Sequence, residues 1–298
     1  MEFAIAGVTI NPLWLAAIGF LVGALGGFFG IGGGFLAGPL MLWLGVPANF
    51  VVGTDLAHLT GSSIISAKRH RALGQVDVRL GLVMIAGTIL GVEGGARLLA
   101  ALQSIGALDR TISLVYIVLL LGIASFTAWE SLRAMRSVRS GNEIAHEAMG
   151  FKGFAQRLQR IHLPPMVSFP ASGIESISLW LVLGVGFLTG LLAGLLGVGG
   201  GFIRMPMLVY LLGIPTHVAV GTDLFEIVFS SAFGTLTHAL KGNVDILMAL
   251  VMHAGAAMGA RIGAALTPYF EGPRIRLLFS ALPVIGALLV FLRLMSGS

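Results

Sequence analysis

The chain has 298 residues, of which 56% are hydrophobic and only 10% are charged. Soluble globular proteins carry about 25% charged residues, so this composition excludes that class and predicts a chain surrounded mostly by lipid. The formal net charge is +5, but the basic residues fall in short breaks between apolar runs. That pattern is typical of charges that orient a membrane protein, and it argues against a nucleic-acid partner. With no cysteine, disulfides, thiolate metal sites and thiol catalysis are excluded.

Eight segments are long enough to cross the apolar part of a bilayer, which takes about 20 residues in a helix. They lie near residues 12–29, 50–67, 78–103, 108–129, 177–196, 218–239, 244–267 and 274–295. Two further apolar pieces, 35–46 and 202–214, are too short to span untilted and are expected to form short or re-entrant helices. The sequence therefore predicts an all-α, polytopic integral membrane protein. Residues 1–11 contain no Lys or Arg, so a cleaved signal peptide is not expected.

One composite motif occurs twice in the chain. Gly-x-Gly-Gly-Gly-Phe begins at Gly30 and again at Gly197, and Gly-Thr-Asp-Leu begins at Gly53 and again at Gly221. The two copies therefore lie 167 to 168 residues apart. We predict two homologous halves, each of four long helices and one short or re-entrant helix. The boundaries are a first transmembrane repeat at 12–129, a connector at 130–176 and a second transmembrane repeat at 177–295.

The connector and one loop carry most of the basic residues. The loop 68–79 has four basic residues and one acidic residue, and the stretch 130–162 has six basic and three acidic residues. Both are expected to be cytoplasmic, because cytoplasmic loops are enriched in Lys and Arg. Within the connector, Phe151, Phe154, Leu158 and Ile161 share one helical stripe, which predicts an amphipathic helix on the membrane surface. A plain linker is the alternative.

The orientation of the second half depends on whether the short segments cross the membrane. If they do, each half has five crossings and the second half is inverted. If they do not, each half has four crossings and the repeats are parallel. The loop of the second half that corresponds to 68–79 has only Lys241 against Asp245, and a neutral loop is suited to the outside. We favour the inverted repeat.

The glycine runs are candidates for binding an anion. Backbone without side chains exposes successive N–H groups, and the helix that follows each run adds the positive end of its dipole. Pro39 and Pro206 stand five residues after the runs, as expected near a helix start. The alternative is that these glycines only allow close helix packing. The predicted substrate-binding glycines are Gly32, Gly33, Gly34, Gly199, Gly200 and Gly201.

Acidic residues follow inside otherwise apolar spans. Asp55 and Asp223 each stand in a predicted membrane helix, and His58 and Glu226 follow one turn later on the same face. An ionised side chain at that depth costs at least about 3 kcal/mol, so these four residues are candidates for proton coupling. Interhelical hydrogen bonding without transport is the alternative. Thr54 and Thr222, beside the acids, are predicted to bind a substrate oxygen.

Arg204 stands three residues after the second glycine run, where the first half has Ala37. A guanidinium beside a backbone anion site favours an anionic solute. The alternative is that Arg204 extends to the membrane interface. The few histidines are scattered, so the sequence predicts no metal site, and no arrangement of residues points to a cofactor or an enzyme.

The combined motifs resemble the TauE/SafE sulfite exporter family. The resemblance rests on the glycine run with its proline, Leu-Gly-(Val/Ile)-Pro, Val-Gly-Thr followed by a polar residue, and His-x-x-x-Gly-x-Val-Asp, each present in both halves. It implies a secondary transporter in the bacterial cytoplasmic membrane that exports small sulfur-containing anions such as sulfite, sulfonates or sulfoacetate. From the buried acids we expect proton coupling, with alternating access of the two halves. A passive anion channel and a transporter of another small organic anion are the alternatives, and the oligomeric state is left open.

Overall fold

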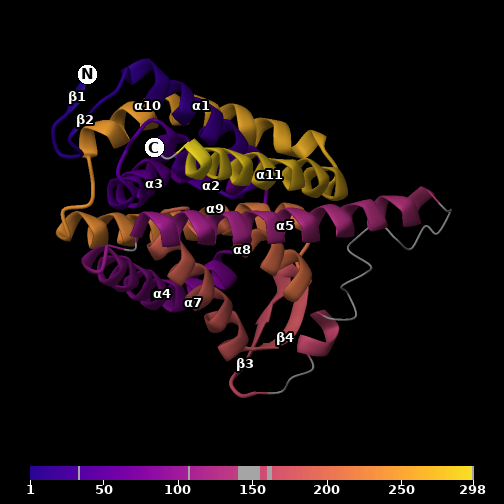
Figure 1. Cartoon of the computed structure of the whole chain (residues 1–298). Coiled ribbons are helices and arrows are strands. Elements are labelled where there is room, and N and C mark those ends of the chain that lie inside the picture. Colours follow the sequence, from indigo (N-terminus) through magenta and orange to yellow (C-terminus); the bar gives the residue numbers. More distant parts are fainter. Residues whose placement is uncertain (33, 107, 140–154, 160–162, 297–298) are drawn as a thin grey trace.

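The computed structural model describes residues 1–32, 34–106, 108–139, 155–159 and 163–296, and helices dominate it (Figure 1). The helices are α1 (Pro12–Phe29), α2 (Gly34–Trp43), α3 (Ala48–Ala72), α4 (Val78–Ser104), α5 (Leu108–Arg139), α7 (Leu179–Leu196), α8 (Gly201–Pro206), α9 (Thr216–Leu240), α10 (Ile246–Leu266) and α11 (Gly272–Ser296). A π-helical turn, Met207–Leu211, extends α8. In each half, a long helix is followed by a short one and then by three long ones.

Seven helices in the described part of the chain are long and apolar enough to cross a membrane, namely α1, α4, α5, α7, α9, α10 and α11. The eighth long helix, α3, has 25 residues, but its polar side chains keep it outside that set. It packs against α1, α2, α9 and α10, so few of its polar residues need to face lipid. The predicted all-α membrane protein is confirmed.

Local sequence explains where several helices begin and end. Gly30 and Gly197 end α1 and α7 in the left-handed conformation, with φ of 77° and 78°, which glycine adopts without steric cost. Asp77 and Asp245 cap the first turns of α4 and α10, because a carboxylate oxygen of each accepts a hydrogen bond from a backbone N–H three residues later.

Two small antiparallel hairpins, which the sequence analysis did not predict, precede the first helix of each half. β1 (Glu2–Phe3) pairs with β2 (Val8–Thr9), and β3 (Met166–Phe169) pairs with β4 (Ile174–Ser178). The second hairpin lies within the range predicted as connector. Residues 155–159 are helical, but Phe151, Phe154 and Ile161 of the predicted amphipathic stripe lie outside the described residues.

Close glycine contacts join helices of different halves. A β-carbon added at Gly19, Gly23 or Gly27 of α1 would meet the backbone of α10. A β-carbon added at Gly186, Gly190 or Gly194 of α7 would likewise meet the backbone of α4. Small residues at this spacing let membrane helices approach closely. The first helix of each half therefore packs on the third long helix of the other half.

The contacts between the halves are reciprocal. A β-carbon at Gly53 would meet the backbone of Asn243, and one at Gly221 would meet the backbone of Gln75. The hydroxyl of Thr54 accepts a hydrogen bond from the backbone N–H of Asp245 at 3.0 Å, and the hydroxyl of Thr222 accepts one from Asp77 at 2.9 Å. Each contact from the first half to the second is thus matched by an equivalent contact from the second half to the first. An approximate two-fold axis therefore relates the halves.

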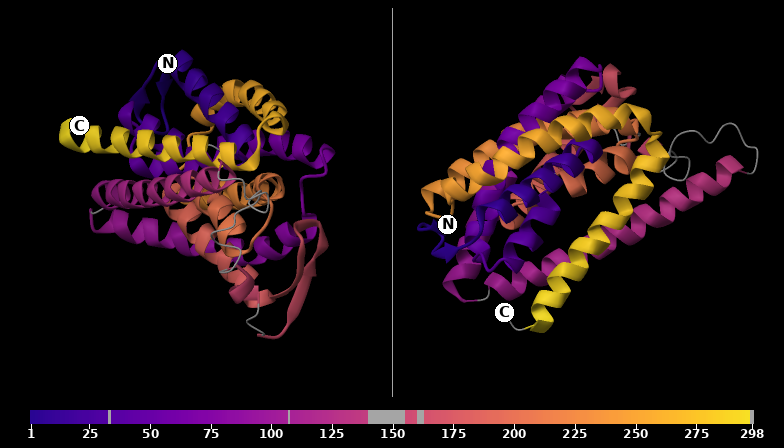
Figure 2. Two further views of the ribbon diagram at one scale, coloured as in Figure 1. Left: turned by 90° about the vertical axis from the view of Figure 1, so that its right-hand side faces the viewer. Right: turned by 90° about the horizontal axis from the view of Figure 1, so that it is seen from above.

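Equivalent helices run in opposite directions where they meet. A β-carbon at Gly234 of α9 would contact Leu56 of α3, whereas Ser231 hydrogen-bonds Thr60 at 3.1 Å. Residue numbers thus rise along α3 as they fall along α9. Figures 1 and 2 show the same relation for α5 and α11, since the C-terminal end of α11 lies near the N-terminal end of α5. The two-fold axis is therefore perpendicular to these helices.

A glycine substitution in the α4–α7 contact tests this packing. Gly190→Ala places a β-carbon against the backbone oxygen of Thr88, and we expect it to lower the free energy of unfolding by about 1–3 kcal/mol because the contact becomes overpacked. Gly184→Ala, on the same helix with no atom within 4 Å, should keep or raise stability since alanine is the better helix former. Thermal unfolding of the detergent-solubilised protein compares the two, and equal losses would contradict the predicted contact.

Candidate functional site

The predicted acidic residues come together in the interior on the two antiparallel helices α3 and α9. Asp55 and His58 lie on α3, and Asp223 and Glu226 lie on α9; all four are at most 1% exposed. Each helix presents its pair on one face, because residues three apart are neighbours on a helix. The fold therefore buries three carboxyl groups within the membrane-spanning part of the protein.

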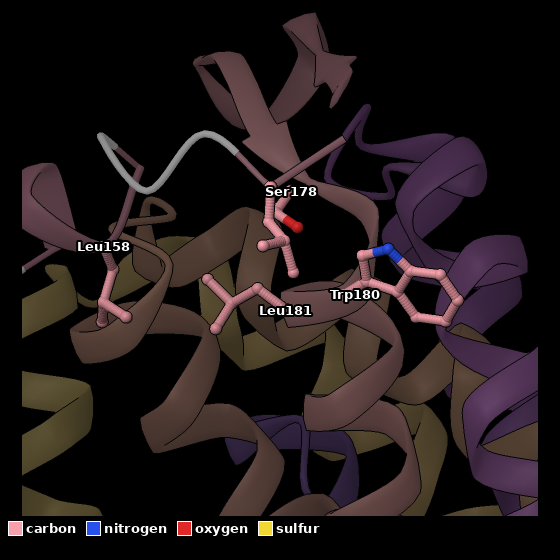
Figure 3. A pocket seen from close by; sticks show the side chains of 5 residues that line it. Leu158, Ser178, Trp180 and Leu181 are labelled. Carbon is pink, nitrogen blue, oxygen red and sulfur yellow. The ribbon is translucent and has the colours of Figure 1, made fainter. Parts of the chain in front are cut away.

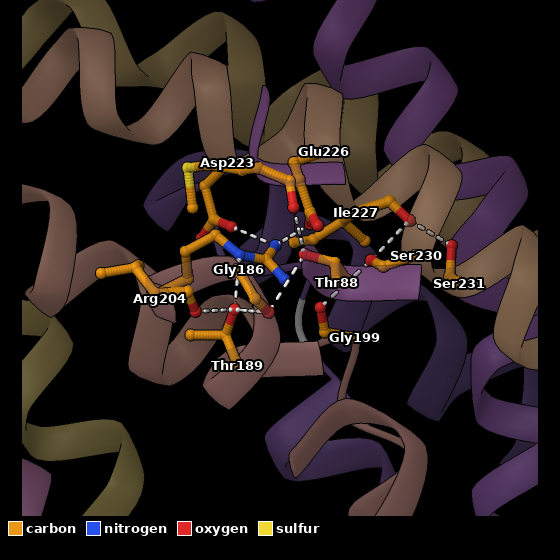
Figure 4. Close-up of polar contacts among 12 residues, drawn as sticks. Thr88, Gly186, Thr189, Gly199, Arg204, Asp223, Glu226, Ile227, Ser230 and Ser231 are labelled. Carbon is orange, nitrogen blue, oxygen red and sulfur yellow. Dashed lines mark hydrogen bonds and ion pairs between the residues drawn. The ribbon is translucent and has the colours of Figure 1, made fainter. Parts of the chain in front are cut away.

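Arg204 of α8 pairs with both acids of α9 (Figure 4). Its Nη1 lies 2.9 Å from Oδ1 of Asp223 and forms a second ion pair with Glu226, and its Nε donates a hydrogen bond to the hydroxyl of Thr189 at 3.1 Å. The guanidinium is 0% exposed. Arg204 is thus held in the interior of the protein. The alternative given in the sequence analysis, in which Arg204 extends to the membrane interface, does not apply in this structure.

The second guanidinium nitrogen of Arg204 is left without a hydrogen-bond partner among the described residues. This nitrogen, Nη2, is buried. A β-carbon added at Gly200 would lie 2.9 Å from it, so only glycine leaves room for the guanidinium there. A buried donor without a partner costs free energy, and an oxyanion is the ligand that would satisfy it best.

The corresponding pair in the first half lacks an arginine. Nδ1 of His58 lies 2.9 Å from Oδ1 of Asp55, and both side chains are 0% exposed. The other carboxylate oxygen, Oδ2, faces Gly34, where an added β-carbon would lie 2.9 Å away. The first half therefore holds one acid and one histidine, and the second holds two acids and one guanidinium.

Two threonines that the sequence analysis did not single out belong to the second-half cluster. Thr189 of α7 accepts the hydrogen bond from Arg204, and Thr88 of α4 lies beside Glu226 and donates hydrogen bonds to the backbone oxygens of Met84 and Gly186, each at 3.1 Å. They are isolated hydroxyl residues in apolar helices, and a polar residue within such a span is a signal that could have identified them.

The hydroxyls of Thr54 and Thr222 have a structural partner in the opposite half. They accept the backbone N–H hydrogen bonds of Asp245 and Asp77 described above, so their role in substrate binding stays a prediction. Those two aspartates also hold the hairpins. Oδ2 of Asp77 accepts a hydrogen bond from the Ser172 hydroxyl at 2.7 Å, and Oδ2 of Asp245 accepts one from the Ala6 backbone at 3.2 Å.

The glycine runs meet at the centre, but they do not form an open anion site in this conformation. Added β-carbons at Gly32 and Gly199 would lie 3.2–3.4 Å from the nearest atoms of Leu59 and Ile227. Gly34 faces Val198 of the other half, and Gly201 correspondingly faces Ile31. Gly33, also predicted to bind substrate, lies outside the described residues. The glycines therefore serve close packing here, and an anion would reach their N–H groups only after a conformational change.

A pocket of about 260 Å³ lies away from these clusters, near the start of α7 (Figure 3). Its lining is almost entirely apolar: Leu158, Leu163, Ser178, Trp180 and Leu181. This pocket lacks charged groups for an anion. We therefore assign the candidate site to the buried clusters on α3, α8 and α9, which are closed to solvent in this conformation.

Comparison with known proteins gives one family. The family model "Sulfite exporter TauE/SafE" matches residues 15–290. The chain is 25% identical over 290 residues to "Probable membrane transporter protein YunE" of Bacillus subtilis, covering 93% of this chain and 96% of that protein. It is 23% identical over 274 residues to "Probable membrane transporter protein YjnA" of the same organism, covering 91% and 96%.

A plant protein gives a shorter match. "Sulfite exporter TauE/SafE family protein 3" of Arabidopsis thaliana is 30% identical over 139 residues, which is 46% of this chain and 28% of that protein. No solved structure matches the chain.

Removing the guanidinium tests the cluster. Arg204→Met leaves the carboxyl groups of Asp223 and Glu226 buried without their cation, and we expect the free energy of unfolding to fall by about 3–5 kcal/mol. Arg97→Met is the matched control, because Arg97 pairs with Glu93 at an exposed position on α4, where ion pairs contribute little. Thermal unfolding measures both variants. Equal stability of the two would mean that Arg204 is not held by the buried acids.

Proposed function

Because the chain belongs to the sulfite exporter TauE/SafE family of membrane transporters, we propose that it exports small sulfur-containing anions such as sulfite, sulfonates or sulfoacetate across the bacterial cytoplasmic membrane. The observation that carries the anion assignment is Arg204, a fully buried guanidinium whose Nη2 has no partner in the described part of the chain. After a conformational change that opens the second glycine run, a small oxyanion beside Nη2 would receive charge-assisted hydrogen bonds from the guanidinium and from backbone N–H groups of that run.

The charge of the buried clusters supports proton coupling. Three carboxyl groups, on Asp55, Asp223 and Glu226, face one guanidinium and one histidine among the described residues. An anion that enters beside Arg204 competes with Asp223 and Glu226 for the same cation. Burial of uncompensated negative charge is costly, so protons on these acids would offset the charge of the substrate. His58 would exchange a proton with Asp55 in the first half.

The relation between the halves supports an inverted repeat with alternating access. An axis perpendicular to α3 and α9 lies in the membrane plane if these helices follow the membrane normal. Two halves so related can exchange their conformations, opening the centre first to one side and then to the other.

Single cysteines test the inverted repeat, because the chain has no cysteine of its own. Leu73 and Lys241 are equivalent exposed positions after α3 and α9. We expect a membrane-impermeant maleimide to label Leu73→Cys and Lys241→Cys from opposite faces of intact cells, with Leu73 on the cytoplasmic side. Labelling of both from the same face would contradict inversion and favour parallel repeats.

Transport in proteoliposomes tests the substrate and the coupling. We expect uptake of labelled sulfite or sulfoacetate to increase when a pH gradient is imposed. Arg204→Lys keeps the charge but removes the second nitrogen, and should lower the flux about tenfold or more because a hydrogen bond to a charged group contributes roughly 1.5–3 kcal/mol. Arg97→Lys, at an exposed position, should not change the flux.

The same assay separates the alternatives. Flux of sulfur anions that is equal with and without the pH gradient would indicate a passive anion channel. Flux of small carboxylates in the absence of any flux of sulfur-containing anions would indicate a transporter of another organic anion.

A further inference from the structure

We propose that Leu59 and Ile227 form a central apolar barrier that separates two unlike polar half-sites, one facing each side of the membrane. The inference rests on the proposed transport function and adds the residues that keep the path closed. The half-site of the first repeat is the Asp55–His58 pair. The half-site of the second repeat is the cluster of Arg204, Asp223 and Glu226.

The two barrier residues occupy equivalent positions and meet at the two-fold axis. Leu59 follows Asp55 by one helical turn on α3, and Ile227 follows Asp223 by one turn on α9; both are 0% exposed. A β-carbon at Gly32 would lie 3.2 Å from Ile227 and 3.3 Å from Leu59, and one at Gly199 would lie 3.2 Å and 3.4 Å from the same two side chains. Each barrier residue thus contacts the glycine turns of both halves.

The antiparallel course of α3 and α9 places one half-site on either side of the barrier. At the start of α3, Thr54 binds the backbone of Asp245, and at the start of α9, Thr222 binds the backbone of Asp77. These two loops lie at opposite ends of the helix pair. From the N-terminal end of α3 toward the centre of the molecule, the helix passes Asp55 and then Leu59. From the N-terminal end of α9, which lies at the opposite end of the helix pair, the helix passes Asp223 and then Ile227.

The barrier residues lie next to buried polar side chains of α3 and α9. Thr60 follows Leu59 and hydrogen-bonds Ser231 across the helix contact at 3.1 Å. Ser63 of α3 and Ser230 of α9 are also buried at 1% exposure. Two branched apolar side chains between these hydroxyl groups would exclude water, because apolar constrictions block ion movement by dewetting. The same pair occupies the space against Gly32 and Gly199, so an anion reaches both glycine turns only when the pair separates.

The arrangement gives the two half-sites different access. The Arg204 cluster lies on the side of the loop between α3 and α4, since the contacts of Gly221 and Thr222 are with Gln75 and Asp77 of that loop. This loop belongs to the basic segment expected in the cytoplasm. An anion from the cytoplasm therefore meets Arg204 first, and a proton from outside meets Asp55 and His58 first.

Proton leak in the absence of any sulfur-containing anion tests the barrier. We would reconstitute the protein in liposomes that contain a pH-sensitive dye, add valinomycin and potassium to balance charge, and acidify the outside. We expect the combined Leu59→Ala and Ile227→Ala variant to leak protons at least about tenfold faster than the unchanged protein, because the apolar constriction is opened. Each single variant should fall between the two.

Equivalent residues one turn away provide the matched control. Leu56 and Leu224 are also 0% exposed on α3 and α9, so alanine there creates buried cavities without opening the barrier. Equal leak rates in the barrier and control double variants would overturn the proposal. If the alanine variants fail to purify as monodisperse protein, Ile227→Thr, which keeps a branched side chain but adds a hydroxyl, should leak, and Ile227→Val should not.

The leak assay is independent of the substrate assignment. If the wild-type protein transports no sulfur-containing anion but the barrier variants leak protons, the proposed substrate is wrong and the proposed barrier still holds. If the wild-type protein transports the substrate but neither the barrier variants nor Ile227→Thr leak protons, the proposed barrier is wrong and the proposed substrate still holds.

Discussion

The buried ion pairs of Arg204 with Asp223 and Glu226 are the interaction on which the rest of the site depends. A guanidinium held away from water is stable only when carboxylates compensate its charge, and here two carboxylates share one of its nitrogens. The cluster needs α7, α8 and α9 in fixed positions, because Thr189 also binds the guanidinium. It leaves one nitrogen of the guanidinium, Nη2, without a hydrogen-bond partner among the described residues. The same pairs therefore hold α8 against α9, and in the proposed function they place the guanidinium where the anion would bind.

The two halves use one backbone framework with different charges. Thr54 and Thr222 make matching hydrogen bonds across the molecule, and the glycine turns make matching contacts. Charged side chains at the centre differ between the halves, since the second half has Arg204 and Glu226 in place of Ala37 and His58. In the function proposed above, the symmetric framework would let both halves move alike, and the unequal charges would let one half bind the anion and the other exchange protons.

The hairpins connect the outer ends of the molecule to this centre. Ser172 and the backbone of Ala6 bind Asp77 and Asp245, the same aspartates whose backbone N–H groups bind Thr222 and Thr54. Each of those threonines precedes a buried acid in the chain. Each hairpin is therefore linked by hydrogen bonds, through one aspartate and one threonine, to the residue that precedes Asp223 or Asp55.

The sequence by itself determined the membrane class, the duplication, the helix order and the burial of Asp55, His58, Asp223 and Glu226, because each depends on local composition and spacing along one helix. The family match over residues 15–290 agrees with the resemblance that the motifs indicated. Only the tertiary structure decided that Arg204 pairs with Asp223 and Glu226, that Thr88 and Thr189 join them, and that Leu59 and Ile227 fill the space between the glycine turns. These contacts join residues from different helices, and their partners follow from how the halves pack across the two-fold axis. Spacing along the chain shows which face of a helix can pack closely, but it does not show which other helix meets that face.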